Sequence, residues 1–315
     1  NDTSDSSKFR QKAFREAIDS LSKYPTRIAD AAEAVKIHGI GTGIAKRIDE
    51  IRKTGQLQEY EDIKKYYPNL DAVLTEFRRI HSVGPRTAMK WYNMGYRSIS
   101  ELPIDGVLRI QQTPGTEPLV LTEIQKIAIR YLADTEQRIP REEIDYFNTQ
   151  LRQYLDAYEK YMATQGVEIK VEYQICGSYL RGLPTSGDID ILVNVGKYPP
   201  ADIMNAILSF PMWRFSLARG QKKFEGLALI RNTHRRVDVE LSPPEEYPLC
   251  LCYFTGPHRF NPMMREHCKK YGYQLNEQSL ISPSGFPVYV RDEHHLFEIL
   301  GIPYLTPQER EAYAK

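Results

Sequence analysis

Cysteine is scarce in this 315-residue chain, which has only Cys176, Cys250, Cys252 and Cys268. Their number and spacing exclude a disulfide framework and a CxxC zinc pair, and they favour a reducing, intracellular compartment. Long apolar runs are also missing, since none approaches the roughly 18 residues of a membrane span. The first ten residues, NDTSDSSKFR, lack the apolar stretch of a secretory signal. We therefore expect no membrane association.

An excess of either charge is missing too, because the formal net charge is +1. The total charge therefore does not point to a nucleic-acid partner, but the placement of the charges does. The stretch from Phe77 to Ser100 contains no acidic residue and five basic ones, which are Arg78, Arg79, Arg86, Lys90 and Arg97. They predict one local cationic surface.

The hydrophobic pattern divides the chain into a helical half and a half that contains a sheet, and the length allows two to four compact units. Up to about residue 140 apolar residues recur at helical spacing, as in Phe9, Ala13, Ala17 and Leu21 or Ile44, Ile48 and Ile51. A long helix follows 138–144, with Tyr154, Tyr158 and Tyr161 expected in the core. Alternating residues then predict a sheet over 167–241 with a helix near 200–208. A helix at 261–271 and short strands around 273–290 complete the expected order.

The helical half contains a short motif that occurs twice. IHGIGTGIAKRI (37–48) and IHSVGPRTAMKW (80–91) each place glycine just before an expected helix, and both resemble the helix-hairpin-helix motif. In that motif the backbone amides at the helix start bind a DNA phosphate without reading sequence. A tight turn between packed helices is the alternative for either copy alone, but two copies with an attached basic run favour DNA binding. The residues concerned are Gly39, Gly41, Gly43, Val83, Gly84 and Arg86.

Carboxylates lie two residues apart on two expected strands. Asp188 and Asp190 of DIDILV share one strand face, and the isoleucines beside them share the other. A pair this close is unfavourable without a cation between the carboxylates. The DID segment alone fits a capped turn followed by an exposed residue. RRVDVEL adds Asp238 on a second strand, and if the two strands are neighbours, the three carboxylates form a site suited to Mg²⁺.

The turn before these aspartates predicts a phosphate site. Gly177 and Ser178 offer a hydroxyl and exposed amides, and Arg181 offers a guanidinium for phosphate oxygens. A GS turn, a D-x-D pair about ten residues later and a carboxylate on a later strand together are typical of nucleotidyltransferases.

With GSYLRGLPTSGDIDILV (177–193), RRVDVEL (235–241) and YFTG (253–256), behind two helix-hairpin-helix units and RIPREE (138–143), the chain resembles the family X DNA polymerases, most closely DNA polymerase beta. The resemblance runs from about residue 9 to the end. It implies a multidomain α+β fold, with helical helix-hairpin-helix domains, a nucleotidyltransferase-fold palm with a mixed sheet and a small α+β C-terminal domain. The implied domains are a lyase-like domain (1–78), a DNA-binding subdomain (79–140), the palm (141–243) and a C-terminal subdomain that binds the nucleotide and the nascent base pair (244–315).

The resemblance also implies roles for individual residues. Asp188 and Asp190 would bind two Mg²⁺ ions, for which Mn²⁺ can substitute, and Asp238 would bind one and accept the primer 3′-hydroxyl proton. The β- and γ-phosphates of the incoming nucleotide would contact a set of five residues: Gly177, Ser178, Arg181, Gly187 and Arg138. Those near the sugar or the new base pair are Tyr253, Phe254, Gly256, Asn261 and Arg265, and Arg236 would lie near the primer-terminal phosphate. K⁺ or Na⁺ would bind at the helix-hairpin-helix turns.

Two departures from the family affect function. The family forms a Schiff base through a lysine of the first domain, and the matching position here is Arg47, whose guanidinium stays protonated. Neighbouring lysine positions hold Arg10, Gly43 and Glu59. We therefore expect Arg10 and Arg47 to hold a 5′-phosphate and the 5′-deoxyribose-phosphate lyase activity to be weak or lost.

The second departure is Glu240, where DNA polymerase beta has an arginine that changes partners on domain closure. Glu277 matches that arginine's partner in the closed state, and two acids cannot form this salt bridge. A water link, partial protonation or another cation remain alternatives.

The function expected from these features is gap-filling DNA synthesis in repair, by an intracellular, nuclear or viral monomer acting on gapped or nicked duplex DNA with dNTPs. The alternatives are a terminal or RNA-directed nucleotidyltransferase and a catalytically silent DNA-binding scaffold. The short connection NTHRRVD (232–238) favours a template-directed enzyme over a terminal transferase.

Overall fold

The computed structural model describes residues 5–110 and 117–313, and the chain divides into two compact units, residues 1–76 and 77–315. Within these described ranges no helix is long and apolar enough to cross a membrane. The chain is a multidomain α+β protein, as its sequence pattern predicts.

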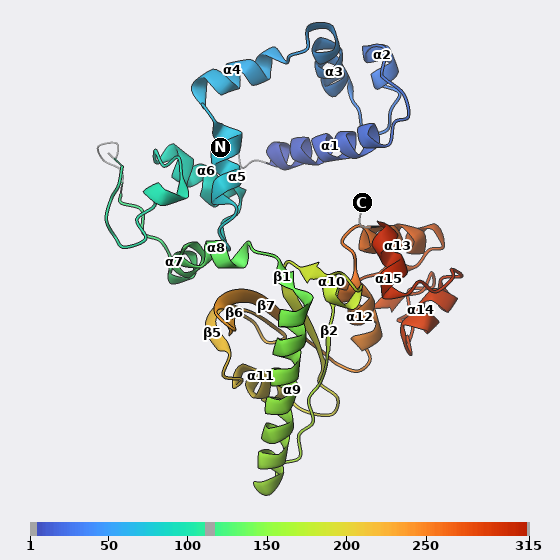
Figure 1. Cartoon of the computed structure of the whole chain (residues 1–315). Coiled ribbons are helices and arrows are strands. Elements are labelled where there is room, and N and C mark those ends of the chain that lie inside the picture. The colour runs from blue at the N-terminus through green and yellow to red at the C-terminus, as the bar shows by residue number, and fades with distance from the viewer. Residues whose placement is uncertain (1–4, 111–116, 314–315) are drawn as a thin grey trace. The chain divides into compact units, whose positions relative to one another are not determined.

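The first unit is helical (Figure 1). Its helices are α1 (Asp5–Ser22), α2 (Ala31–Ala34), α3 (Thr42–Thr54), α4 (Gln58–Tyr66) and most of α5 (Leu70–Phe77). Its core is small and centres on five residues: Ala17, Ala34, Ile37, Ile40 and Ala45. The expected apolar stripe is only partly buried, because Phe9 is 72% exposed and Ile51 is 47% exposed. Helical spacing shows which residues share a face, but the amount of core available to cover that face depends on the tertiary structure.

The second unit begins with helical segments. These are α6 (Pro85–Asn93), the short 3-10 helix η1 (Ile99–Glu101), α7 (Glu123–Arg130) and α8 (Leu132–Thr135). Trp91 in α6 is buried and contacts Phe77 edge to face, with 5.5 Å between the ring centroids. Its position in the basic segment therefore reflects packing.

A five-stranded mixed sheet forms the centre of the second unit. Its strands are β2 (Glu172–Ile175), β4 (Ile189–Asn194), β5 (Trp213–Arg219), β6 (Lys223–Ile230) and β7 (Thr233–Ser242), in the order β2-β4-β7-β6-β5. Only β4 and β7 run parallel, and the other neighbours are antiparallel. The strands β1 (Ile139–Pro140) and β3 (Thr185–Ser186) form a separate two-stranded sheet.

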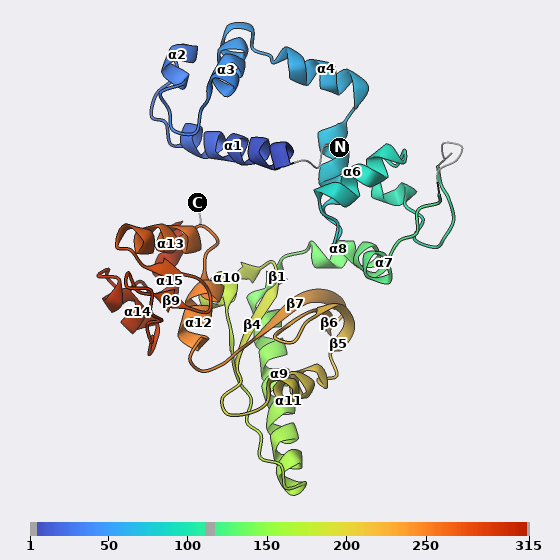
Figure 2. The same cartoon turned by 180° about the vertical axis from the view of Figure 1, so that it is seen from behind.

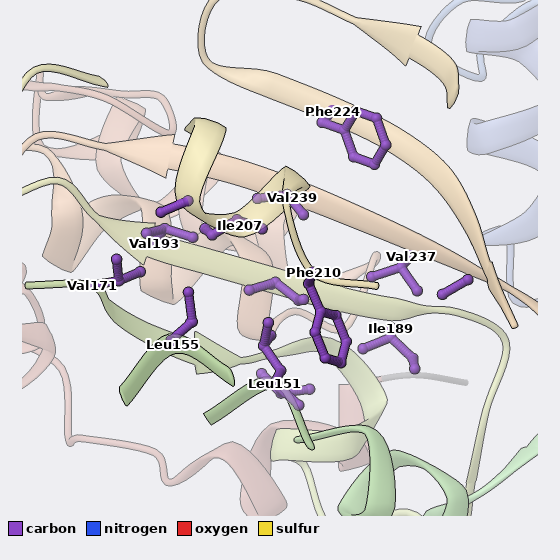
Figure 3. Packing of buried hydrophobic residues seen from close by; sticks show 14 of the residues in the cluster. Leu151, Leu155, Val171, Ile189, Val193, Ile207, Phe210, Phe224, Val237 and Val239 are labelled. Atoms are coloured by element: carbon purple, nitrogen blue, oxygen red, sulfur yellow. The ribbon is translucent and has the colours of Figure 1, made fainter. Parts of the chain in front are cut away.

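Two helices cover one face of the central sheet, α9 (Arg141–Thr164) and α11 (Pro200–Leu208) (Figures 1 and 2). Figure 3 shows the packing: Leu151 and Leu155 of α9 lie against strand residues such as Ile189 and Val237. These four side chains are fully buried, and burial of each contributes roughly 1.5–3 kcal/mol. Because strand side chains alternate, the polar residues between them face away from α9 and α11.

The structure corrects two expectations for this region. The first strand of the central sheet begins only at Glu172, and Ile169 and Val171 are buried without belonging to a strand. Tyr161, expected in the core, is 60% exposed, whereas Tyr154 and Tyr158 pack against the core. Tyr161 lies in the last turn of α9, close to the helix end at Thr164.

The C-terminal part of the second unit has its own core. Its elements are α12 (Tyr247–Thr255), α13 (Phe260–Lys270), β8 (Gln274–Leu275), β9 (Leu280–Ile281), α14 (Glu293–Ile299), α15 (Pro307–Arg310) and the 3-10 helix η2 (Glu311–Tyr313). Buried residues such as Phe260, Met264 and Phe297 fill the space between these helices. We call residues 244–313 the C-terminal subdomain.

Candidate active site

Three carboxylates meet at the edge where β4 and β7 begin to pair. Asp190 lies directly opposite Asp238 in the parallel pair, and Asp188 comes one residue before β4. One oxygen atom from each side chain lies within 4.8 Å of the others. The two strands are therefore neighbours, which was the condition for a three-carboxylate site. We call Asp188, Asp190 and Asp238 the acidic cluster.

The electrostatics of the acidic cluster favour a bound cation. The pKa of Asp190 is raised to about 7, first by burial and then by the nearby carboxylates of Asp188 and Asp238. Burial likewise raises the pKa of Asp238 to about 7, although the nearby Arg236 acts against this rise. These shifts mean that it costs free energy to keep the buried carboxylates charged. A positive ion among them would remove much of that cost.

Arg236 provides part of the positive charge that offsets the three carboxylates. Its Nη2 donates a hydrogen bond to Asp188, and its Nε lies 4.0 Å from Asp238 Oδ2. Arg236 Nε and Asp238 Oδ1 are nevertheless buried without a hydrogen-bond partner in the part of the chain that the structure describes. An acceptor oxygen left unpaired inside a carboxylate cluster fits a metal ligand. The donor set therefore suits a hard divalent cation.

The turn that leads into the cluster is shaped around its second aspartate. Gly177 opens the short helix α10 (Gly177–Leu180) with φ +59°, and a Cβ there would collide with Asp190 Oδ2. Only glycine tolerates both the positive φ and the lack of space for a Cβ. Ser178 Oγ donates to Ser186 Oγ at 2.8 Å, which ties the turn to β3.

The other residues predicted to contact phosphate lie around the same turn. Arg138 donates to the Thr185 carbonyl at 2.6 Å, and Gly187 lies close to its guanidinium. Arg181 is only 12% exposed and donates from Nε to Glu311 at 2.5 Å. The sequence pattern gave no indication of Glu311, because its short helix is 130 residues away along the chain.

The residues predicted near the sugar and the new base pair gather at the end of α12. Asn261 donates to the Tyr253 carbonyl at 2.9 Å, and the Arg265 guanidinium lies 5.6 Å from the centre of the Tyr253 ring. These three line a small cavity of about 20 Å³. Phe254 packs partly against Cys176 and Cys250, so it is less accessible than Tyr253. Gly256 follows the helix with φ +62°.

Glu240, which stands where DNA polymerase beta has an arginine, forms an ion pair with Lys223. This residue is 5% exposed, and its carboxylate lies 2.9 Å from Lys223 Nζ. Burial raises the pKa of Glu240, and Lys223 acts in the opposite direction. Glu277 pairs instead with Arg265 at 3.2 Å. Sequence reasoning missed Lys223, although the β6–β7 hairpin places it directly opposite Glu240 and a two-residue turn at 231–232 would predict that register.

The two glycine turns have matching backbones. Gly39 has φ +79° and Ser82, at the equivalent position, has φ +67°, so the serine adopts the conformation of the glycine. Gly41 and Gly84 then cap α3 and α6 in extended conformations, and neither makes a side-chain cap. The first-turn amides of these helices, which include those of Gly43 and Arg86, therefore remain available to an anion. Val83 is buried beneath its turn.

The second turn borders a cavity of about 530 Å³. Residues 78–84 line one side, and the lining extends to α8, to β5 and β6, and to Arg236 beside the acidic cluster. Arg79 is held by Glu136 through two hydrogen bonds of 2.6 and 2.7 Å. Arg86 and Lys90 have side chains without ion pairs inside the described ranges. The expected cationic surface is therefore partly neutralised.

In the first unit Arg47 is also paired. Its guanidinium donates to Glu59 at 2.8 Å and to the Gly43 carbonyl at 3.2 Å, and it lies 5.8 Å from the ring of Phe14. Arg10 is exposed on α1. A phosphate bound by Arg47 would have to compete with Glu59.

Family models match consecutive parts of the chain. They describe a helix-hairpin-helix domain (residues 2–57), the fingers domain of DNA polymerase lambda (75–136), the DNA polymerase beta palm (138–244) and the DNA polymerase beta thumb (250–311). The palm match contains the acidic cluster and the turn at Gly177–Leu180, and the thumb match contains Tyr253 and Arg265.

Two curated relatives match almost the whole chain. DNA polymerase lambda of Rattus norvegicus is 27% identical over 332 residues, which cover 96% of this chain and 53% of the relative. DNA polymerase lambda of Arabidopsis thaliana is 27% identical over 337 residues, which cover 96% of this chain and 58% of the relative. The chain thus spans about half the length of the curated relatives it matches.

Proposed function

The chain belongs to the family X DNA polymerases, and from this premise we propose that it is a template-directed DNA polymerase that fills short gaps during repair. The observation that carries the proposal is the acidic cluster, whose three oxygens lie within 4.8 Å of one another, next to the turn that begins with Gly177. Gapped or nicked duplex DNA and dNTPs are the proposed substrates, and the enzyme works as a monomer. The four free cysteines favour an intracellular setting.

Magnesium is the proposed cofactor, with manganese as a substitute. Two such ions, when bound, neutralise the charge that develops on the attacking and leaving oxygens of an in-line displacement. Asp188 and Asp190 would hold both ions, and Asp238 would hold one and accept the proton of the primer 3′-hydroxyl. Arg236, which now pairs with Asp188, is proposed to contact the primer-terminal phosphate instead.

The nucleotide lies between the phosphate turn and α12. Gly177, Ser178, Arg181, Gly187 and Arg138 bind its β- and γ-phosphates. Positioning and charge stabilisation then account for nearly all of the catalysis in phosphoryl transfer.

The base and sugar of the nucleotide contact the C-terminal subdomain. Tyr253, Phe254 and Gly256 contact the sugar and exclude a ribose 2′-hydroxyl. Asn261 and Arg265 approach the minor-groove edge of the new base pair. Support comes from the contacts that bring Tyr253, Asn261 and Arg265 together at the end of α12.

The DNA backbone binds at the two glycine turns, which would also bind K⁺ or Na⁺. The matching conformations of Gly39 and Ser82 support this proposal. With it we propose four functional domains: a lyase-like domain (1–78), a DNA-binding subdomain (79–140), the palm (141–243) and the C-terminal subdomain from residue 244 onward.

Template dependence is the test of this function. We expect the chain with Mg²⁺ to add only the complementary one of four dNTPs to a primer at a one-nucleotide gap. Addition of all four nucleotides to single-stranded primer would indicate a terminal transferase, and no addition would indicate a DNA-binding scaffold. The β6–β7 connection supports template direction, because only Arg231 and Asn232 separate the strands.

The lyase-like domain is proposed to have little or no lyase activity, because Arg47 replaces the nucleophile and is paired with Glu59. Borohydride trapping on a pre-incised abasic substrate tests this. We expect no covalent band for the wild type and none for Lys46→Ala. A strong band in the wild type would overturn the proposal, and its loss in Lys46→Ala would identify the adjacent lysine as the nucleophile.

A further inference from the structure

Arg181 is held on two sides by the C-terminal subdomain. Its Nε donates to Glu311 Oε2 at 2.5 Å, and its Nη1 donates to the Thr255 carbonyl at 2.7 Å. Thr255 ends α12 and Glu311 begins η2, so the two acceptors come from different elements. Arg181 itself follows α10, at the turn that leads to the acidic cluster.

Glu311 is placed by a well-anchored segment. The preceding residue, Arg310, is fully buried, pairs with Glu293 at 2.8 Å and lies against three aromatic rings, those of Phe260, Phe297 and Tyr304. A capping box formed by Thr306 and Glu309 begins α15. The carboxylate of Glu311 is therefore presented from a fixed backbone.

A second contact joins the same two segments without involving charge. Gln308 donates to the Leu180 carbonyl at 3.4 Å, and its side chain lies next to Gly182. Among the described residues, Gln308 makes no hydrogen bond with the guanidinium of Arg181. Packing of the segment and pairing of Arg181 can therefore be altered separately.

The anchored Arg181 guanidinium has further N–H groups that can donate hydrogen bonds. Arginine carries five N–H groups, and the two hydrogen bonds described above use one on Nε and one on Nη1. Nη2 makes no hydrogen bond within the described residues, and it is not among the buried atoms without partners. It is therefore accessible to a solvent-borne anion.

We propose that Glu311 is a positioning residue for the incoming nucleotide: it fixes the Arg181 guanidinium so that the free N–H groups face the triphosphate. The inference rests on the proposed polymerase function and adds a residue of the C-terminal subdomain to nucleotide binding. Arginine has many rotamers, and a fork fixed in advance loses less freedom when it binds phosphate. Without Glu311 the guanidinium keeps only the Thr255 carbonyl and can turn away.

Nucleotide affinity is the measurement. The protein is bound to gapped DNA with a dideoxy-terminated primer, so that no chemistry occurs, and the correct dNTP is titrated with Mg²⁺. We expect Glu311→Gln to raise Kd, and KM on an extendable primer, by roughly tenfold, because a charge-assisted anchor is lost. We expect kcat to change by less than about twofold, since the acidic cluster is untouched. Glu311→Asp, which keeps the charge, should recover part of the affinity.

Two controls separate positioning from packing. Gln308→Ala loosens the same segment but leaves the charge pair, so it should leave KM within about twofold of the wild type. In an Arg181→Ala background, Glu311→Gln should cause no further loss, because its effect acts through that arginine.

An unchanged or lowered KM for Glu311→Gln would overturn the inference, as would an equal effect of Gln308→Ala or a full effect in the Arg181→Ala background. Failure of the wild type to incorporate any nucleotide would refute the proposed polymerase function instead. The two failures are therefore distinguishable.

Discussion

Replacing Asp238 by asparagine should stabilise the metal-free protein. The substitution keeps the size of the side chain and removes one negative charge from the acidic cluster. Asp238 Oδ1 is buried without a hydrogen-bond partner among the described residues, so little favourable interaction is lost. The nearest cation, Arg236 Nε, is 4.0 Å away from the other oxygen.

The pKa of Asp238 sets the size of the effect. Burial is the main cause of its rise from 3.8 to about 7. At about 1.4 kcal/mol per pH unit this difference corresponds to an upper limit of about 4 kcal/mol. Well below pH 3.8 the carboxyl is protonated in both states and does not affect stability. As the pH rises towards 7, the unfolded chain releases the proton first, so the wild type loses stability relative to Asp238→Asn, and above 7 the difference is constant.

The assay is urea unfolding in EDTA at several pH values between 4 and 8. Both tryptophans, Trp91 and Trp213, belong to the second unit, so their fluorescence reports on the unit that holds the cluster. The exposed Asp202 of α11 provides a control, and Asp202→Asn should change the free energy of unfolding by no more than about 0.5 kcal/mol. Added Mg²⁺ should stabilise the wild type more than Asp238→Asn at pH 8. If Asp238→Asn is no more stable than the wild type at pH 8 in EDTA, the reasoning is wrong.

Three further substitutions test separate parts of the structure. Gly177→Ala should lower nucleotide incorporation on the order of 100-fold, because its Cβ displaces a carboxylate of the acidic cluster; Gly196→Ala, at a similar φ of +56° but with only the Tyr198 ring near its Cβ, at 3.9 Å, should not. Lys223→Met should cost about 1–2 kcal/mol of stability in urea unfolding, because it leaves the buried Glu240 unpaired, and a second change, Glu240→Gln, should restore most of it. Phe147→Ala should cost about 3–5 kcal/mol by the same assay, since its ring is fully buried, and a loss below about 1 kcal/mol would contradict the assigned core.

The sequence was sufficient to predict the centre of the site. A side-chain period of two puts Asp188 and Asp190 on one face of the first strand, and it puts Asp238 and Glu240 on one face of the second. The parallel pairing of the two strands then brings the aspartates together. The position of Lys223 also follows from local rules, because the hairpin turn determines which residue faces Glu240.

Other features depend on tertiary packing that no local pattern encodes. The contact between Arg181 and Glu311 joins segments 130 residues apart through the placement of α15 and η2. The exposure of Phe9 reflects how small the core of the first unit is, which helical spacing does not reveal. The backbone of Ser82 likewise could not be read from residue type, because this serine adopts the left-handed conformation that glycine has at the matching position of the first turn.

The most direct test of the central claim compares the wild type with Asp238→Ala on a one-nucleotide gap with a 5′-phosphate, measuring single-nucleotide incorporation and DNA affinity in the same samples. The acidic cluster is proposed to bind the metal ions and the DNA to bind mainly at the glycine turns. We therefore expect Asp238→Ala to bind the gapped DNA within about twofold of the wild type and to incorporate no nucleotide. Robust extension of the primer by Asp238→Ala would contradict the account.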